Sequence, residues 1–436
     1  MQKILLKKEI TLTVIVLFIG LSVIPSTGTT VEKSSLSFDG KTLYVGGSGE
    51  GNYTKIQDAI DNASDGDTVF VYNDSSPYIE DVVVDKSINL IGEDRNSTCI
   101  NGWRTGDVVY VIADRVNISG FRIRNCGDDP GYAGVKITSD NNNVYNNKFL
   151  KNFGSSIILE HSSFNTIQNN VLLDNIYFHI YLRNSSYNII QGNILNKSEN
   201  WHYEVDGIWL LNSSNNLIQN NIIKNLNFRV GINLFNSSTN NTLQGNIICD
   251  NEAEDSNMIQ ISDSNFNTIV DNTLKWNKGH GIALFFSSDN KVLRNTIESV
   301  CEIGIGLVHC FNTIVKNNNI TSNRIGIHVS IGSSMNTFES NNIVNNDMGV
   351  EIKDARIDPH IIGDCILNKI KYNNFLGNKR MAYDNNFLAL NTWHGNYWNR
   401  PRLLPKMIIG IRTIIGNIKI PVIHFDLRPA KEPYDV

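Results

Sequence analysis

The stretch Asn165–Asn170 reads NTIQNN, and nearly the same string returns as NLIQNN at Asn216–Asn221. Both follow the pattern Asn-x-apolar-x-x-Asn, which recurs ten times between residues 142 and 373 at steps of 22 to 32 residues. The copies begin at Asn142, Asn165, Asn188, Asn216, Asn241, Asn267, Asn290, Asn312, Asn336 and Asn368, and a second asparagine follows five residues later in each. A recurring period of this size is typical of a solenoid, in which each copy stacks on its neighbours.

The second half of each copy has the form Gly-[Ile/Val]-x-[Leu/Ile/Val], as in Gly207–Leu210, Gly231–Leu234 and Gly281–Leu284. Apolar residues alternate here with period two, which is typical of strands, and no helical spacing persists through a copy. We therefore predict an all-β fold: a parallel β-helix with about 22–26 residues per coil and about 4.8 Å between coils.

The repeated asparagines have a physical reason in such a fold. In stacked coils, the same turn residue lies directly over its predecessor, so we expect Asn147, Asn170 and Asn193 to superpose. An asparagine tolerates the left-handed conformation of a tight bend, and its amide can both donate and accept hydrogen bonds along a ladder. The apolar residue between the asparagines is expected to point inward and to stack into a dry core.

The two ends of the solenoid depart from the repeat. Residues 53–63 place apolar side chains on one helical face, with Thr54 and Gln57 as a capping box, so we predict a short helix that covers the front coil. The β-helix is expected over 41–390, with asparagine-ladder coils over 142–378, and residues 391–436 are expected to form a rear cap. A membrane-surface segment is an alternative interpretation of this tail, because it places arginines and lysines beside isoleucines.

The first residues resemble a targeting segment. Lys3, Lys7 and Lys8 precede an apolar run at 10–24 and a small-residue exit, which predicts a signal peptide over 1–28. An uncleaved membrane anchor is the alternative, and it would be the one membrane contact we expect. Both interpretations place the rest of the chain outside the cytoplasmic membrane, as a secreted or cell-surface protein.

Composition narrows the class of protein further. The chain has 436 residues, a formal net charge of −5 and 19% charged residues, which argues against a nucleic-acid partner. Its six cysteines contain no CxxC, so zinc and redox motifs are not indicated. Cys99 and Cys126 are spaced so that they could lie on neighbouring coils and oxidise.

The lid helix, the strand after Gly66-Asp67-Thr68-Val69 and the NTIxxN coils together resemble the right-handed parallel β-helix proteins of the pectin-lyase-like superfamily. Within it, the chain is most similar to NosD-type and carbohydrate-binding and sugar-hydrolysis repeat proteins, over roughly residues 41–390. The resemblance implies either a link to copper-enzyme maturation or an action on polysaccharides. The repeated residues are those that build coils, so the fold does not decide between these functions.

A candidate ligand face follows from superposing the copies. The outward positions between residues 158 and 308 are unusually apolar and aromatic, and longer loops that feed this face carry more rings and charges. Flat aromatic faces suit the C–H surfaces of sugars, and charged groups suit their hydroxyls. The predicted ligand-binding residues are Tyr181, Arg183, Trp201, Trp209, Phe235, Trp276 and His280.

Three functions remain open from the sequence. The sequence favours a non-catalytic or weakly catalytic module that binds extracellular polysaccharide or cell-envelope glycan. A polysaccharide lyase or glycoside hydrolase is the second, with Glu204, Asp206 and Asp255 as acid or base groups and Arg229 neutralising substrate charge. The third is a NosD-like accessory or structural protein that contacts a cell-surface protein.

Two other features of the sequence, a pair of polygalacturonase-like motifs and the candidate metal ligands, are weaker indications of function. The polygalacturonase-like pieces Gly127-Asp128-Asp129 and Gly279-His280-Gly281 lie about six coils apart, roughly 29 Å, so they cannot share one glycosidic bond. We predict no cofactor and no metal ligands. Copper is disfavoured because Met, Cys and His do not cluster, whereas calcium could bind the acidic stretch at 250–255.

Overall fold

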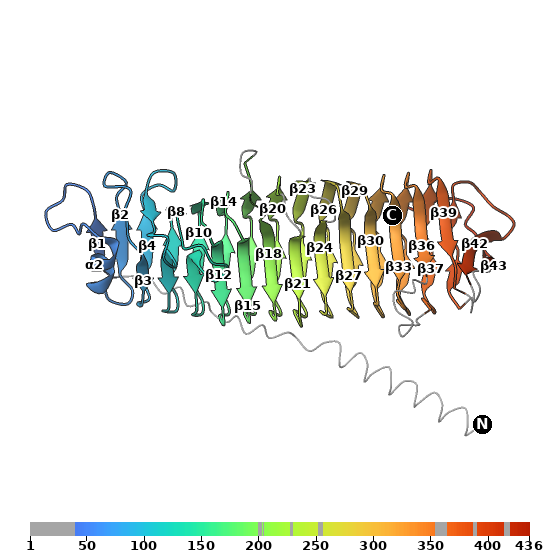
Figure 1. Cartoon of the computed structure of the whole chain (residues 1–436), viewed down its shortest axis with the longest axis horizontal. Coiled ribbons are helices and arrows are strands. Elements are labelled where there is room, and N and C mark those ends of the chain that lie inside the picture. The colour runs from blue at the N-terminus through green and yellow to red at the C-terminus, as the bar shows by residue number, and fades with distance from the viewer. Residues whose placement is uncertain are drawn as a thin grey trace, which may run out of the picture. The chain divides into compact units, whose positions relative to one another are not determined.

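The computed structural model describes residues 40–198, 203, 205–226, 230–251, 256–353, 364–386, 390–413 and 419–436. Residues 40–436 form one compact unit in which the chain winds through parallel strands, coil upon coil (Figure 1). The fold is a right-handed parallel β-solenoid of about fourteen turns with almost no helix, so the predicted fold class is confirmed. The described residues contain no helix long and apolar enough to cross a membrane.

Three sheets run along the solenoid, and each coil contributes one strand to each. Sheet A carries the short strands of the NTIQNN type and ends in an antiparallel hairpin. In pairing order, its strands are β1 (Thr42–Val45), β2 (Thr68–Val71), β4 (Asn89–Gly92), β7 (Asn117–Ser119), β10 (Asn143–Tyr145), β13 (Thr166–Gln168), β16 (Ile189–Gln191), β19 (Leu217–Gln219), β22 (Thr242–Gln244), β25 (Thr268–Val270), β28 (Lys291–Leu293), β31 (Ile314–Lys316), β34 (Thr337–Glu339), β37 (Lys369–Lys371), β40 (Thr392–His394), β43 (Lys419–Asp426) and β42 (Lys406–Thr413).

Sheet B has 13 strands and follows the second asparagine of each copy. Its strands are β5 (Cys99–Asn101), β8 (Arg122–Arg124), β11 (Lys148–Leu150), β14 (Val171–Leu173), β17 (Ile194–Asn196), β20 (Ile222–Lys224), β23 (Ile247–Asn251), β26 (Thr273–Asn277), β29 (Thr296–Val300), β32 (Asn319–Thr321), β35 (Asn342–Val344), β38 (Asn374–Leu376) and β41 (Tyr397–Trp398).

Sheet C also has 13 strands, contains the Gly-Ile-x-Leu segments and has the longest strands of the coils. Its strands are β3 (Val82–Val84), β6 (Val109–Val111), β9 (Ala133–Ile137), β12 (Ser155–Glu160), β15 (Phe178–Arg183), β18 (Asp206–Leu211), β21 (Val230–Phe235), β24 (Asn257–Ser262), β27 (His280–Phe285), β30 (Ile303–Val308), β33 (Ile325–Ser330), β36 (Met348–Lys353) and β39 (Arg380–Asp384).

The core consists of apolar columns that run along the solenoid. Ile167, Ile190 and Ile218 pair in register on adjacent coils, and all three are fully buried. Because each inward residue packs mainly against its own counterparts above and below, a single coil could not form this core alone.

The asparagine ladder predicted from the repeat is present. The Asn147 backbone N–H donates to Asn170 Oδ1 at 2.9 Å, Asn170 donates to Asn193 Oδ1 at 3.0 Å, and Asn193 donates to Asn221 Oδ1 at 3.0 Å. The side-chain amides add parallel bonds, such as Asn170 Nδ2 to Asn193 Oδ1 at 3.0 Å. These bonds run from one coil to an acceptor on the next coil, so the backbone part of the ladder has a direction. The side-chain amides also donate to carbonyls of the preceding coil, as Asn170 Nδ2 does to Val144 at 2.8 Å.

Two details of the predicted ladder are wrong. In one copy the register is shifted by one residue, because Thr313 and Asn318, not Asn312 and Asn317, make the ladder bonds to the next coil. The left-handed conformation also belongs to the preceding residue, as at Asn169 with φ 55°, and not to the buried ladder asparagine. The bend needs a left-handed residue that faces solvent, whereas the ladder needs an amide that points inward.

The front of the solenoid is covered by helix α2 (Ile56–Asp61), which is shorter than the predicted 53–63. The predicted capping box is wrong, because the structure gives the helix no side-chain bond at its N-cap, Lys55. Instead the Glu80 carboxylate accepts from the backbone N–H groups of Ile56 and Gln57 at 2.9 and 3.1 Å. A residue 23 positions away thus satisfies the donors that a helix leaves open at its start.

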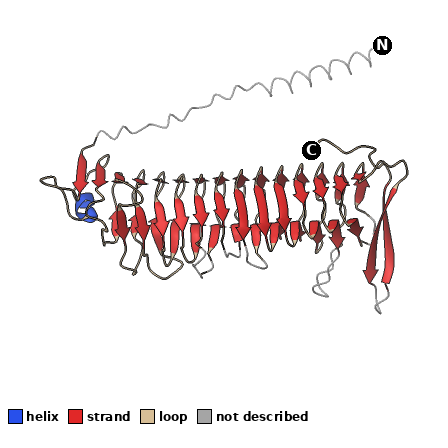
Figure 2. Cartoon of the chain, turned by 90° about the horizontal axis from the view of Figure 1, so that it is seen from above, coloured by secondary structure: helices blue, strands red, loops and turns tan. Residues whose placement is uncertain are grey.

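The rear cap begins later in the chain than the predicted residue 391. Asn391 and Asn396 continue both ladders, since they accept from the N–H groups of Asn368 and Asn373 at 3.0 Å, and WHGNYW forms a further coil. The hairpin of β42 and β43 closes the opposite end of the solenoid from helix α2 (Figure 2). Asp426 on this hairpin then receives the Asn396 N–H at 2.9 Å, in the position of a next-coil asparagine.

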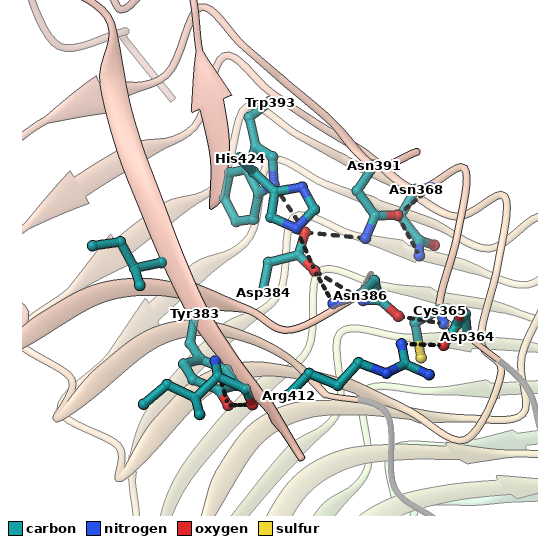
Figure 3. A network of polar contacts seen from close by, with 12 residues as sticks. Asp364, Cys365, Asn368, Tyr383, Asp384, Asn386, Asn391, Trp393, Arg412 and His424 are labelled. Carbon is teal, nitrogen blue, oxygen red and sulfur yellow. Dashed lines mark hydrogen bonds and ion pairs between the residues drawn. The ribbon is translucent and has the colours of Figure 1, made fainter. Parts of the chain in front are cut away.

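The other ladder also ends on a buried aspartate (Figure 3). Asp384 Oδ2 accepts from Asn391 Nδ2 at 3.1 Å and from Trp393 Nε1 at 3.2 Å, and Oδ1 accepts from Asn386 Nδ2 at 2.8 Å. His424 Nε2 lies 3.4 Å from the same carboxylate. Cys99 and Cys126 are both buried and free, so the disulfide considered above is not formed.

Candidate functional site

The outward face of sheet C is the candidate site, and strand register fixes which residues line up on it. Tyr181 pairs with Trp209, Trp209 with Asn233, and Asn233 with Gln260. A second outward row, two residues further along each strand, aligns Glu160 with Arg183, Arg183 with Leu211, and Leu211 with Phe235. The order of side chains that the sequence indicated for this face is therefore the order in the structure.

Three rings cluster on the coils of β15 and β18. Phe178 lies 4.9 Å from Tyr181 and 5.3 Å from Trp209, measured between ring centroids, with the second pair edge to face. All three side chains are half-buried, so each keeps part of its surface in contact with solvent. Burial raises the pKa of the Tyr181 phenol, and the phenol is therefore a hydrogen-bonding group rather than a charge at neutral pH.

A charged triad adjoins these rings on the N-terminal side. Lys136 Nζ lies 2.9 Å from one oxygen of Glu160, and the guanidinium of Arg183 lies 3.2 Å from the other. The hydrogen bond from Lys136 lowers the pKa of Glu160 although burial opposes it. One carboxylate thus holds two cations in place, and the triad has a net charge of +1.

Asp107 is a site residue that sequence reasoning missed. Burial raises its pKa to about 6, although the Ala133 N–H donates to it at 2.7 Å and Lys136 stabilises its charge. It precedes β6, in a coil before the first Asn-x-apolar-x-x-Asn copy, so no repeat marked it as unusual. Of the predicted acid or base groups, Asp206 instead accepts from the Val230 N–H at 3.0 Å.

Beyond Trp209 the face becomes neutral and amide-rich. Asn257 Nδ2 donates to Gln260 Oε1 at 2.7 Å, and Gln260 Nε2 donates to Ser262 Oγ at 3.0 Å. Asn233 and Asn257 are 2% and 8% exposed, and the side-chain oxygen of each has no hydrogen-bond partner. Neither oxygen accepts a hydrogen bond from the protein, and a buried acceptor without a donor lowers the stability of the fold unless another donor reaches it.

The remaining predicted residues are not gathered at one point. Phe235 continues the second outward row and is 38% exposed, and His280 lies on sheet C in register with Asn257. Trp276 lies on β26 of sheet B, 56% exposed, and so belongs to a different face. Trp201, Glu204, Arg229 and Asp255 lie outside the described residues.

The stacked coils, the three parallel sheets and the ladder define this protein as a right-handed parallel β-helix of the pectin-lyase-like type. Within that class, the chain belongs to the NosD family, whose model is described as periplasmic copper-binding protein (NosD) and matches residues 60–258 and 246–418. A comparison with curated protein sequences finds no match.

Solved structures show the same fold at low sequence identity. The A-module of the mannuronan C-5 epimerase AlgE6 from Azotobacter vinelandii is 14% identical and has a TM-score of 0.57, with 80% of this chain and 95% of that chain covered. The catalytic unit of a thermostable GH87 α-1,3-glucanase from Streptomyces thermodiastaticus strain HF3-3 is 14% identical with a TM-score of 0.51, covering 75% of this chain and 61% of that chain.

The family description raises the question of copper, and the described residues do not fit it. Across residues 40–436, as far as they are described, no three or more His, Cys, Asp or Glu side chains could hold a metal ion together. His179 is fully buried, and burial lowers its pKa to about 3. It therefore lies among core residues and not at a surface where a metal could enter. We assign no step to copper. Of the predicted calcium stretch at 250–255, residues 252–255 lie outside the described residues.

Proposed function

We propose that this protein lies outside the cytoplasmic membrane and binds polysaccharide on the outward face of sheet C. The observation that carries the proposal is the half-buried ring cluster of Phe178, Tyr181 and Trp209 beside the triad of Lys136, Glu160 and Arg183. Tyr181 and Trp209 pair in register on adjacent coils, so the ring cluster offers an apolar surface that spans two coils of the solenoid. A linear polymer fits such a surface better than a compact ligand, because repeated units can meet repeated coils.

The chemistry of the face supports a sugar in particular. Aromatic rings pack against the C–H faces of pyranose units, and carboxylate or guanidinium groups bind their hydroxyls. Further along the same row, Gln260 is partly exposed and presents an amide to solvent. The charged triad carries one net positive charge, which the nearby Asp107 carboxylate offsets above its pKa of about 6.

The structural neighbours are consistent with this proposal. One is named for the epimerisation of mannuronan and another for the hydrolysis of α-1,3-glucan, so the same architecture serves polysaccharides in both. The NosD family description places its members in the periplasm, which agrees with the proposed location.

Catalysis on the same face is a second candidate, favoured by Asp107. A carboxyl with a pKa near 6 can exchange a proton close to neutral pH, and it lies near Lys136 and Glu160. A lyase or hydrolase would release soluble fragments from a polymer, whereas a binder would retain the polymer unchanged. Product release from a panel of glycans therefore separates the two functions.

Retention of the protein in gels that contain neutral or acidic polysaccharides tests the binding proposal. We expect Trp209→Ala to weaken retention about tenfold or more, because the main stacking surface is removed. The matched control is Tyr44→Ala, which removes a 41% exposed ring from another aromatic cluster, on β1 of sheet A. Equal retention of Trp209→Ala and the unmodified protein on every polysaccharide that binds would refute the proposed face, as would an equal loss in Tyr44→Ala.

A further inference from the structure

The terminal hairpin exposes an apolar face that the solenoid does not cover. The strands pair Met407 with Phe425 and Ile409 with Ile423, so these side chains share one face. They are 40% to 50% exposed, as is Ile411 next to them. The opposite face of the hairpin, which includes Ile408, is buried against the last coil. The hairpin therefore needs only one of its two apolar faces to close the solenoid.

The segment that leads into the hairpin is more exposed still. It reads RPRLLPK at 400–406, and Leu403 and Leu404 are 85% and 77% exposed. Leu427, which follows β43, is 69% exposed and emerges at the same end of the hairpin, because Lys406 pairs with Asp426. These three are the most exposed large apolar side chains in the described part of the chain. Adjacent leucines with so little contact indicate a surface that packs against something else.

Cations without acidic partners surround these leucines. Burial lowers the pKa of Lys406, and the nearby charges of Arg402 and Arg400 lower it further, so the three cations lie close together. Among the described residues, none of the three forms an ion pair with an acidic group. By contrast, Arg412 on the same hairpin lies 2.7 Å from Asp364 and is neutralised by it (Figure 3). The positive charge at the start of β42 is therefore available to an external anion.

A groove beside the hairpin adds to this charge. It has a volume of about 330 Å³, lies between β39 and β42, and is lined by Lys379, Arg380 and Lys406 among others. The Lys379 ammonium already pairs with Asp347, and Arg380 donates to the Ile409 carbonyl at 2.9 Å. Lys406 is the lining cation without such a partner, so it is the group that we expect an anion in this groove to contact.

We propose that this end of the solenoid binds the surface of an anionic lipid bilayer. Leucines inserted to the depth of the acyl chains would leave water, while Arg400, Arg402 and Lys406 would contact headgroup phosphates. A basic residue near an anionic membrane strengthens binding roughly fivefold, so three contribute about a hundredfold. A second copy of the chain fits the face less well, because it would bring a second unpaired cationic cluster against the first. This inference does not rest on polysaccharide binding.

The test uses the full chain with a fluorophore at the proposed point of insertion. Leu404→Cys is labelled in a Cys301→Ser background, because Cys301 is the exposed native thiol. Burial and the neighbouring Asp250 raise the pKa of Cys249 to about 12, so that thiol reacts slowly. Vesicles contain phosphatidylcholine alone or with phosphatidylglycerol, and both carry lipids with a quencher in the acyl chain. The control probe is Val83→Cys on β3, a 40% exposed apolar position at the other end of the solenoid.

We expect quenching of the residue 404 probe in anionic vesicles, little in neutral ones, and none of the Val83 probe. A triple change in the labelled chain should weaken the apparent lipid affinity about a hundredfold: Arg400→Gln, Arg402→Gln and Lys406→Gln. Its circular dichroism spectrum should stay unchanged. A residue 404 probe that stays unquenched overturns the proposal, even if the N-terminal segment brings the chain to the vesicle. The chain could instead self-associate without any quenching. If the double change Leu403→Ser and Leu404→Ser abolished that self-association, the face would be assigned to a second copy of the chain.

Discussion

Replacing one ladder asparagine in the middle of the solenoid should lower the stability of the protein markedly, because the side chain is fully buried and makes hydrogen bonds to both neighbouring coils. Asn246 Oδ1 accepts from the Asn221 backbone N–H at 3.0 Å, and its Nδ2 donates to the Ile218 carbonyl at 2.9 Å and to Asn272 Oδ1 at 3.0 Å. Asn246→Ala removes all of these bonds but keeps the backbone N–H that also donates to Asn272 Oδ1 at 2.9 Å.

The magnitude follows from the groups left behind. The Asn221 N–H is buried and loses its acceptor, which costs about 1–3 kcal/mol, and the lost bond to Ile218 costs about 0.5–1.5 kcal/mol. We therefore expect a loss of about 2–4 kcal/mol in the free energy of unfolding. Asn246→Asp keeps the acceptor but removes the amide donor and places a carboxylate beside two other oxygens. It should destabilise the protein at pH 8 and recover part of that loss at pH 4.

Urea unfolding followed by tryptophan fluorescence measures this loss. Because a solenoid can unfold in parts, hydrogen exchange at coils 221–272 checks that the change is local. The matched control is Gln244→Ala, which removes an exposed amide at the end of β22, two residues before Asn246, and should change stability by less than about 0.5 kcal/mol. Equal stabilities of Asn246→Ala and Gln244→Ala would refute the view that the ladder stabilises the stack.

Two further outcomes follow from buried carboxylates. Asp107 has a pKa of about 6, above its ordinary 3.8, so the folded state binds this proton more tightly and loses stability as pH rises towards and beyond 6. Asp107→Asn should therefore raise the thermal midpoint relative to the unmodified protein at pH 8 but not at pH 3.5, and an equal shift at both values contradicts this origin. Asp426 accepts from the N–H of Asn396 at 2.9 Å and from Trp398 Nε1 at 3.0 Å, both on the same oxygen. Asp426→Asn would place an amide N–H group against these donors in at least one orientation of the side chain. We therefore expect the free energy of unfolding to fall by about 2 kcal/mol or more, measured by denaturant unfolding. An unchanged free energy of unfolding would contradict the capping role.

The fold could be predicted well from the sequence because each coil of a solenoid places the same kinds of residue at the same positions. Period-two alternation in Gly207–Leu210 and its counterparts predicted the long strands of sheet C, and superposing the copies predicted which side chains neighbour Trp209. One register shift was missed because Asn312 and Asn317 fit the Asn-x-apolar-x-x-Asn pattern, whereas the residue that takes the first ladder position in this copy is Thr313. Only the hydrogen bonds of the adjacent coils distinguish the two registers.

The candidate site was predictable only in part. Tyr181 and Arg183 could be placed on the outward rows, because those rows continue the repeat. Phe178 and Asp107 could not, since the first lies before the Gly-Ile-x-Leu segment and the second precedes the repeat altogether. The elevated pKa of Asp107 depends on burial by several chain segments, which a one-dimensional pattern does not contain. The exposed leucines at 403 and 404 are likewise visible only once the hairpin is folded onto the last coil.

The direction of the ladder has a consequence for assembly. The backbone N–H of each ladder asparagine donates to the coil after it, and Asp426 accepts the last of these bonds, from Asn396. A second molecule that met this end would find the Asp426 carboxylate, which has no N–H group, in place of the amide that continues the ladder from coil to coil. The position of Asp426 therefore sets the length of this ladder: a duplicated coil inserted before it can add one more step, whereas a coil appended after it would meet a carboxylate instead of an amide.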